Sequence, residues 1–234
     1  MAKRVLRESG SRRRVAVVLS RSVLRLDPSQ GRATRTLGAA QVIEPNDIPD
    51  ADLGPLAALI GTWSGDKGID VAPEPNGTEE NPYYETLCFE PVGEVRNAES
   101  QVLTTVRYLQ IVRRKSDDVV FHDQTGYWMW DAASSTVMQS LTIPRAVCVL
   151  AGGEHAAAAD PAASVRLRVH AKLDDPNWGI VQSPFMRDKA RTLEFSHELT
   201  IKGDRLSYSE TTQIDIYGRS FEHTDRNELT RQSD

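Results

Sequence analysis

The 234-residue sequence lacks most of the features that mark membrane proteins and the common enzyme classes. No apolar run approaches the roughly 18 residues that a membrane-spanning helix requires. There is no glycine-rich phosphate loop after a strand, no nucleophile elbow, no His-Glu-x-x-His pair and no Cys-x-x-Cys pair. We therefore expect no membrane contact, and few residues remain that can carry chemistry.

Cysteine is scarce, with only Cys88 and Cys148 in the chain, each inside an apolar strand-like run. This pattern favours two buried free thiols, which suit a reducing compartment and hence a cytoplasmic location. A single disulfide stays open as an alternative, because the sequence does not show whether the two residues are adjacent in space.

Positive charge is concentrated in one segment. Residues 1–35 carry ten Lys or Arg and two acidic residues, a formal +8, which leaves −13 on residues 36–234. So acidic a body argues against a nucleic-acid partner. We interpret 1–51 as a basic, disordered extension and linker, with a transit peptide, a twin-arginine signal at 12–14 and a nucleic-acid-binding arm as alternatives.

From residue 52 onward the chain shows almost no helical period. A short helix at 52–60, with Asp52 as N-cap and Pro55 in its first turn, is expected to cover one end of the fold. Alternation then predicts an all-β domain over 52–234, a single antiparallel up-and-down β-barrel of about ten strands. A two-sheet sandwich is the alternative. Loops are expected at 69–82 and 151–163, and strands near Trp63 and at 83–90, 101–114, 118–131, 135–143, 145–151, 164–173, 179–183, 189–202, 205–217 and 219–228.

Two histidines stand out as candidate site residues. His122 shares one strand face with Gln124, Gly126, Trp128 and Trp130, and the glycine between bulky rings leaves room for something to lie against that face. The alternative for His122 is a core histidine paired with a neighbouring polar side chain.

His223 follows the last long strand and is either a surface turn residue or a metal ligand. One histidine is enough to hold haem iron, whereas zinc requires three or four protein ligands. His155, His170 and His197 are interpreted as solvated or ordinary barrel-wall residues.

Four segments, in this order, resemble the nitrobindin family of haem-binding β-barrels, one of which forms the C-terminal domain of a human THAP-type protein. They are Gly61–Gly65 with its Gly-x-Trp opening, His122–Tyr127, Gly203–Tyr208, and His223 at the spacing of the family's proximal histidine. The resemblance covers about 53–230. Lys67 departs from it, standing where the opening motif has its third glycine.

The resemblance implies haem b in an apolar lumen, with His223 Nε2 as the axial iron ligand. It places His122 and Thr142 beside the open sixth position, Thr212 in the pocket wall and Lys189 near a haem propionate. The implied partners are small molecules, namely haem, nitric oxide and peroxynitrite. The implied activities are reversible nitric oxide binding and, as a haem-dependent enzyme, isomerisation of peroxynitrite to nitrate.

Two other functions are compatible with the same barrel. A non-catalytic carrier of a fatty acid or other apolar small molecule would use an inward Arg or Tyr, for which Arg107, Tyr108 and Arg166 are candidates. A barrel filled by its own side chains would instead serve as an interaction module.

Overall fold

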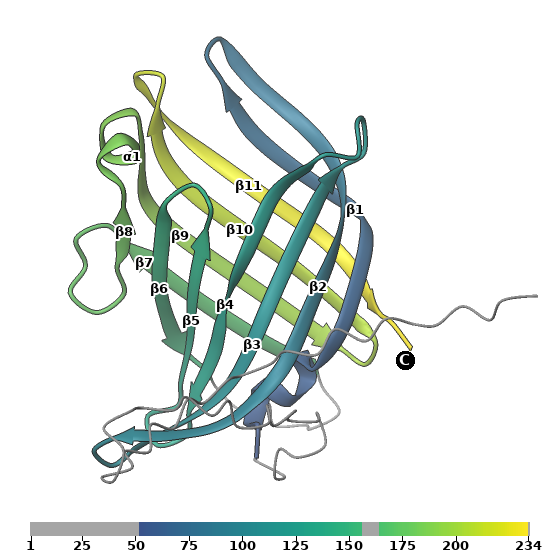
Figure 1. Cartoon of the computed structure of the whole chain (residues 1–234), viewed down its shortest axis with the longest axis vertical. Coiled ribbons are helices and arrows are strands. Elements are labelled where there is room, and N and C mark those ends of the chain that lie inside the picture. The colour runs from purple at the N-terminus through teal and green to yellow at the C-terminus, as the bar shows by residue number, and fades with distance from the viewer. Residues whose placement is uncertain (1–51, 156–163, 234) are drawn as a thin grey trace, which may run out of the picture. The chain divides into compact units, whose positions relative to one another are not determined.

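Figure 1 shows the computed structural model of the protein, which describes residues 52–155 and 164–233. The expected extension at 1–51 lies outside the described residues, as does 156–163 of the expected loop. Among the described residues, no helix is both long and apolar enough to cross a bilayer.

The strands form one antiparallel sheet that closes on itself. Its order is β5-β4-β3-β2-β1-β11-β10-β9-β7-β6-β8, and the additional pairing of β5 with β6 joins the ends into a ten-stranded barrel, with the three-residue β8 paired alongside β6. The predicted up-and-down barrel is confirmed. The elements are η2 (Gly54–Leu59), β1 (Gly61–Glu74), β2 (Gly77–Ala98), β3 (Gln101–Arg114), β4 (Val120–Asp131), β5 (Thr136–Ile143), β6 (Val147–Glu154), β7 (Val165–Lys172), β8 (Ile180–Gln182), α1 (Pro184–Lys189), β9 (Ala190–Lys202), β10 (Arg205–Ile216) and β11 (Arg219–Arg231).

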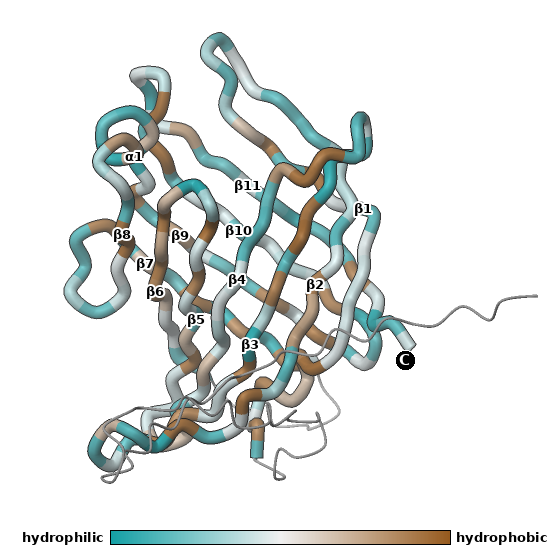
Figure 2. The backbone as a smooth tube through the Cα atoms, viewed as in Figure 1, coloured by the Kyte–Doolittle hydropathy of each residue, from teal (hydrophilic) through white to brown (hydrophobic). Residues whose placement is uncertain are grey.

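Alternation along the strands places one face in the interior. Along β7, for example, buried Leu167, Val169 and Ala171 alternate with exposed residues. The tube in Figure 2 accordingly shows short hydrophobic segments alternating with hydrophilic ones. Every second side chain of a strand points into the barrel, and together these side chains fill its interior, as in other small closed barrels.

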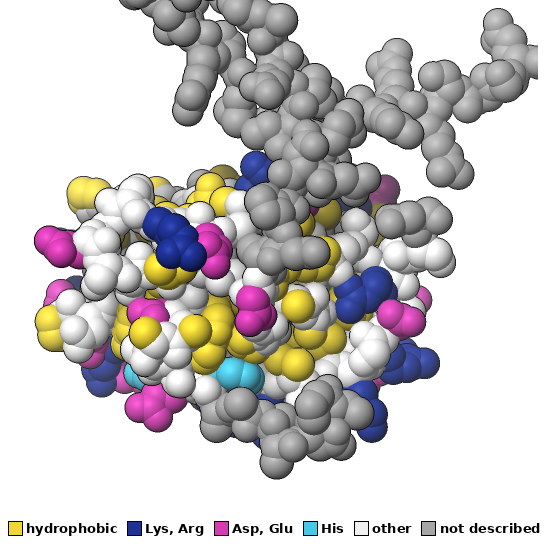
Figure 3. All heavy atoms as spheres, turned by 90° about the horizontal axis from the view of Figure 1, so that it is seen from below, with side chains coloured by type: hydrophobic (Ala, Val, Ile, Leu, Met, Phe, Trp, Pro, Cys, Tyr) yellow, Lys and Arg dark blue, Asp and Glu magenta, His cyan; other side chains and the backbone are white. Residues whose placement is uncertain are grey.

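One end of the barrel is sealed by η2 and the start of β1. Trp63 is fully buried, and its Nε1 donates to the carbonyl of Leu59 at 2.7 Å. The Arg231 guanidinium lies 4.0 Å from the Trp63 ring centroid and donates to the carbonyls of Ala58 and Ile60. Seen from this end, apolar side chains gather at the centre of the face (Figure 3). The predicted lid is therefore present, as a 3₁₀-helix.

Three details of the secondary-structure prediction are wrong, the first being that residues 151–154 of the expected loop at 151–163 belong to β6. The expected loop at 69–82 is the far half of the β1–β2 hairpin, with its turn at 75–76. Its prolines are tolerated because β1 pairs with β11 only as far as Val71, which leaves Pro73 without a ladder on that side. The six-residue α1 was not predicted, although Ser183 caps it by accepting from Met186 N and Pro184 opens it.

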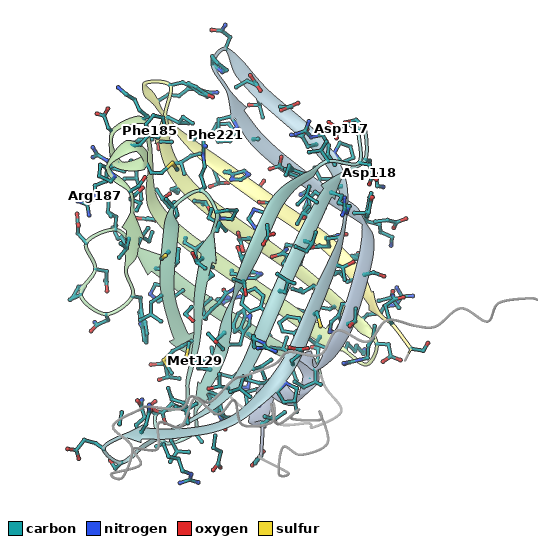
Figure 4. The ribbon with its side chains drawn as sticks, viewed as in Figure 1. Asp117, Asp118, Met129, Phe185, Arg187 and Phe221 are labelled. Carbon is teal, nitrogen blue, oxygen red and sulfur yellow. The ribbon has the colours of Figure 1, made fainter. Side chains whose placement is uncertain are left out.

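The opposite end of the barrel, which we call the mouth, carries the β1–β2, β3–β4, β5–β6 and β10–β11 turns together with α1 (Figure 1). Phe185 and Arg187 of α1 and Phe221 of β11 lie on one side of this end, and Asp117 and Asp118 lie on the other (Figure 4). Phe185 is 62% exposed. The mouth thus combines apolar side chains with a charged rim.

Candidate functional site

Five ionisable side chains on four strands face the interior just inside the mouth. This mouth cluster consists of Asp70 on β1, His122 on β4, Glu210 on β10, and His223 and Asp225 on β11. The structure thus brings His122 and His223, the two histidines singled out in the sequence, to one place, and their charges interact.

His223 is held by carboxylates. Its Nε2 lies 2.6 Å from Asp70 Oδ1 and 3.5 Å from Asp225 Oδ2. Asn81 donates at 3.0 Å to the other oxygen of Asp70, which fixes the orientation of that carboxylate. Asp70 is 3% exposed, whereas the His223 side chain is 30% exposed and can be reached from the mouth. Asp70 thus occupies Nε2, the atom that the resemblance assigns to the iron, whereas in metal-ligating imidazoles a carboxylate usually holds the ring nitrogen that does not bind the metal.

The two histidines have opposite electrostatic environments. Burial lowers the pKa of His223, but the hydrogen bond to Asp70 and the charge of Asp225 outweigh it, so the pKa is raised overall. Burial, together with the nearby His223, lowers the pKa of His122, whose Nε2 lies 3.2 Å from Gln124 Oε1. The surroundings thus favour the neutral form of His122 and the protonated form of His223.

Two carboxyl groups of the cluster, those of Asp225 and Glu210, have raised pKa values. Burial raises the pKa of Asp225 to about 7, with Asp70 contributing. Burial and the charge of Asp225 raise the pKa of Glu210 to about 8. Removal of these carboxylates from water is the main cause, and the charge of His223 offsets it only in part.

A β-bulge in β1 brings Asp70 to this site. The pairing of β1 with β2 shifts register between Gly65 and Gly68, so Trp63 and Asp70 both face inward although they are seven residues apart. At Gly68 a Cβ would collide with the Tyr83 ring. Strict alternation therefore predicts the wrong face for Asp70, and only the glycine pair signals the bulge.

Below the mouth cluster the lumen is filled by hydrogen-bonded polar side chains. Glu85 Oε1 accepts from Tyr208 at 2.8 Å and from Asn227 at 2.7 Å, and its Oε2 accepts from Gln110 at 2.7 Å. Tyr83 lies 2.6 Å from the Tyr208 hydroxyl. Tyr108, Gln124, Gln139 and His197 form a second chain of contacts. The expectation of an apolar lumen is therefore wrong.

The predicted inward face of β4 is correct, since Gln124 and Trp128 are each 1% exposed. The interpretation that Gly126 leaves room for a ligand is wrong, because no such space remains beside it. A Cβ at Gly126 would collide with the carbonyl oxygen of Ser140 on β5. The glycine allows β4 and β5 to approach closely.

The other candidates from the sequence lie in different places. Thr212 is the register partner of His223 on β10 and also faces inward. Thr142 is exposed on the outer face of β5, where Cys148 Sγ donates to it at 3.4 Å, because its neighbours Leu141 and Ile143 face inward. Thr142 therefore does not line the mouth. Lys189 ends α1, 64% exposed, and pairs with Asp188.

The carrier candidates do not form an inward anchor. Arg107 pairs with Glu90 and Arg166 with Glu198, both on the outer face, while the buried Tyr108 hydroxyl bonds Gln124 and Gln139. Cys88 and Cys148 are free thiols, but Cys148 is exposed rather than buried.

The volumes inside the barrel limit what it holds. A cavity of about 10 Å³, enough for one water, lies between His122, Glu210 and Asp225. A larger hollow of about 470 Å³ lies over the outer faces of β7, β9 and β10 and shares no residue with the mouth cluster. A porphyrin ring therefore does not fit the lumen.

A closed antiparallel barrel, sealed at one end and with an inward histidine at the other, defines a small-ligand-binding β-barrel. The chain belongs to the THAP4-like, heme-binding beta-barrel domain family, whose model matches residues 52–231. No curated protein matches it. The crystal structure of Rv2717c from M. tuberculosis is similar in fold, with a TM-score of 0.60 and 22% identity over 80% of this chain and 100% of that one. The nitrobindin-like resemblance is confirmed.

Proposed function

We propose that the barrel binds haem b at its mouth through His223, and that this haem binds nitric oxide reversibly and isomerises peroxynitrite to nitrate. The observation that carries the proposal is the inward His223 at the open end, held on one ring nitrogen by the buried Asp70. Family membership supports the cofactor.

Each residue of the chain has a distinct part in this proposal. Asp70, itself fixed by Asn81, holds His223 by Nε2 and would orient the ring, so His223 would present Nδ1 rather than Nε2 to the iron. Neutral His122 stands across the mouth as a hydrogen-bonding group for a small oxygen- or nitrogen-containing molecule. When bound, haem would supply an iron centre for diatomic ligands.

The rim would hold the remainder of the cofactor. Phe185 and Phe221 offer apolar surface on one side of the mouth (Figure 4), and Thr212 lies beside His223. Lys189 on α1 is proposed as a propionate partner, since it is solvent-exposed and needs only to leave Asp188. The free thiols are consistent with a cytoplasmic location, which forms part of the proposal.

Haem titration tests the proposal directly. The full chain, mixed with ferric haem, is expected to give a Soret band characteristic of histidine ligation, and His223→Ala is expected to lose it. His170→Ala is the matched control, because His170 is exposed on the outer face of β7. Nitrate yield from peroxynitrite then tests the activity. An identical spectrum for His223→Ala and the unmodified chain would remove His223 from the axial position.

A further inference from the structure

The backbone register sets three carboxylates side by side near the mouth. Asp70 on β1 pairs directly with Asp225 on β11, and Asp225 pairs directly with Glu210 on β10. All three side chains face inward. Like charges directly opposite one another destabilise a sheet, so this row is costly unless something compensates it.

The described residues offer little compensation. Within 52–155 and 164–233, the basic groups paired with these three carboxylates are the histidines His223 and His197. The deeper Glu85, in contrast, accepts hydrogen bonds from three neutral donors. The row therefore has the charge of a cation site, whereas Glu85 has the surroundings of a structural buried acid.

Three donor atoms in this row already converge. Asp70, His223 and Asp225 each offer one donor atom within 4.8 Å of the others, and His223 Nε2 lies 3.5 Å from Asp225 Oδ2. Ligands bound about 2.0–2.2 Å from one tetrahedral ion lie roughly 3.4 Å apart. An ion would thus require only a small widening of the 2.6 Å contact between His223 and Asp70, in place of the proton that now joins them.

We propose that the haem-free barrel binds a divalent first-row transition-metal ion through Asp70, His223 and Asp225. One nitrogen and two carboxylate oxygens suit zinc, manganese or iron better than calcium, which takes six to eight oxygens. The fourth position faces the water-sized cavity beside His122 and Glu210, which has room for a bound water.

Ion and haem would both use the His223 imidazole, the ion through Nε2 beside Asp70. The proposal of an ion site, however, is argued from the carboxylates and does not depend on the proposed haem function. Asp225→Asn separates the two: the amide nearly keeps the shape of the side chain while removing one anionic donor, and it leaves the axial histidine in place.

The experiment is calorimetric titration of Zn²⁺ into the full chain after chelation and without haem. One equivalent is expected to bind; Asp225→Asn is expected to weaken affinity at least tenfold and to leave the Soret band with added haem unchanged. His223→Ala is expected to abolish both. Glu222→Gln is the matched control, because Glu222 is exposed on the outer face of β11.

Two results would overturn the ion site: no Zn²⁺ binding by the chelated protein, or equal affinity in Asp225→Asn and the unmodified chain. If Asp225→Asn does not fold, the visible spectrum of the Co²⁺-loaded unmodified chain decides. A low-coordinate nitrogen–oxygen spectrum that Zn²⁺ displaces supports the site, and the spectrum of hexaaqua Co²⁺ rejects it. Loss of the haem signal alone bears on the proposed function and not on the ion.

Discussion

The buried ionisable side chains inside this barrel differ sharply in the partners that surround them. Glu85 accepts from neutral donors, and Glu210 and Asp225 lie beside one another. His197 is buried, and its Nε2 has no hydrogen-bond partner among the residues that the structure describes. His197 instead donates from Nδ1 to Gln139, in contact distance of Trp128 and Tyr208. The polar interior therefore contains groups that are held in one protonation state by their surroundings.

His197 is expected to make the fold sensitive to acid. Burial lowers its pKa to about 3, while an unfolded histidine takes up its proton near pH 6.5. The unfolded chain thus binds more protons in this window, so stability should fall as pH drops from about 6.5 towards 3, by roughly 5 kcal/mol in the limit. Urea unfolding of the unmodified chain and His197→Gln at pH 4–8 measures the slope.

The variant should have the shallower slope on the acid side. His170→Gln on the outer face of β7 is the control, and its slope should match that of the unmodified chain. Parallel curves for His197→Gln and the unmodified chain would contradict the assignment.

Some of this site could be predicted from the sequence. Alternation gave the inward face of β4 with His122, and the same rule applied to β11 places Asp225 inward once His223 is inward. Asp70 could not be found by alternation, because the bulge at Gly65–Gly68 changes the phase of β1. Carboxylates in strands are normally solvated, so composition alone gave no reason to place them inside.

At the scale of elements, strand pairing in this barrel departs from regular geometry at a few positions. The β1–β2 hairpin extends through Pro73, the β2 strand absorbs Pro91 as a register shift, and β4 approaches β5 closely at Gly126. The prediction of a loop at 69–82 is wrong because proline ends a strand only where that strand is hydrogen-bonded to a neighbour on both sides.

Gly126→Ala tests the close approach of β4 and β5. The added methyl group would overlap the Ser140 carbonyl oxygen in the pairing of these strands, so a loss of about 3 kcal/mol is expected. Gly77→Ala is the matched control, since no atom lies within 4 Å of the position that its methyl group would take. Urea midpoints of the two variants give the comparison; equal midpoints would show that β5 moves aside without cost.

For the molecule as a whole, alternation indicated a barrel, and the pairing of β5 with β6 shows its closure. The content of the lumen was not predictable in the same way. Alternation shows which residues face inward, but whether they fill the space depends on barrel radius and on partners from strands far apart in the sequence. Tyr83 and Tyr208, 125 positions apart, meet by their hydroxyl groups in the interior.

The sealed end is expected to depend on Arg231. Arg231→Ala removes the contact with Trp63 and the bonds to the carbonyls of Ala58 and Ile60, for a loss of about 2–4 kcal/mol. That corresponds to a melting temperature lower by several degrees. Scanning calorimetry measures it, with Arg205→Ala, exposed on β10, as the control. Faster hydrogen exchange in η2 should accompany the loss, and unchanged exchange there would contradict it.

Within the part of the chain that the structure describes, Trp63, Arg231 and η2 close one end of the barrel, so a ligand enters and leaves at the mouth. Whatever occupies the mouth must depart by the route along which its successor arrives. Exchange is then strictly sequential, and the residence time of the departing molecule sets the pace at which the barrel can be reloaded.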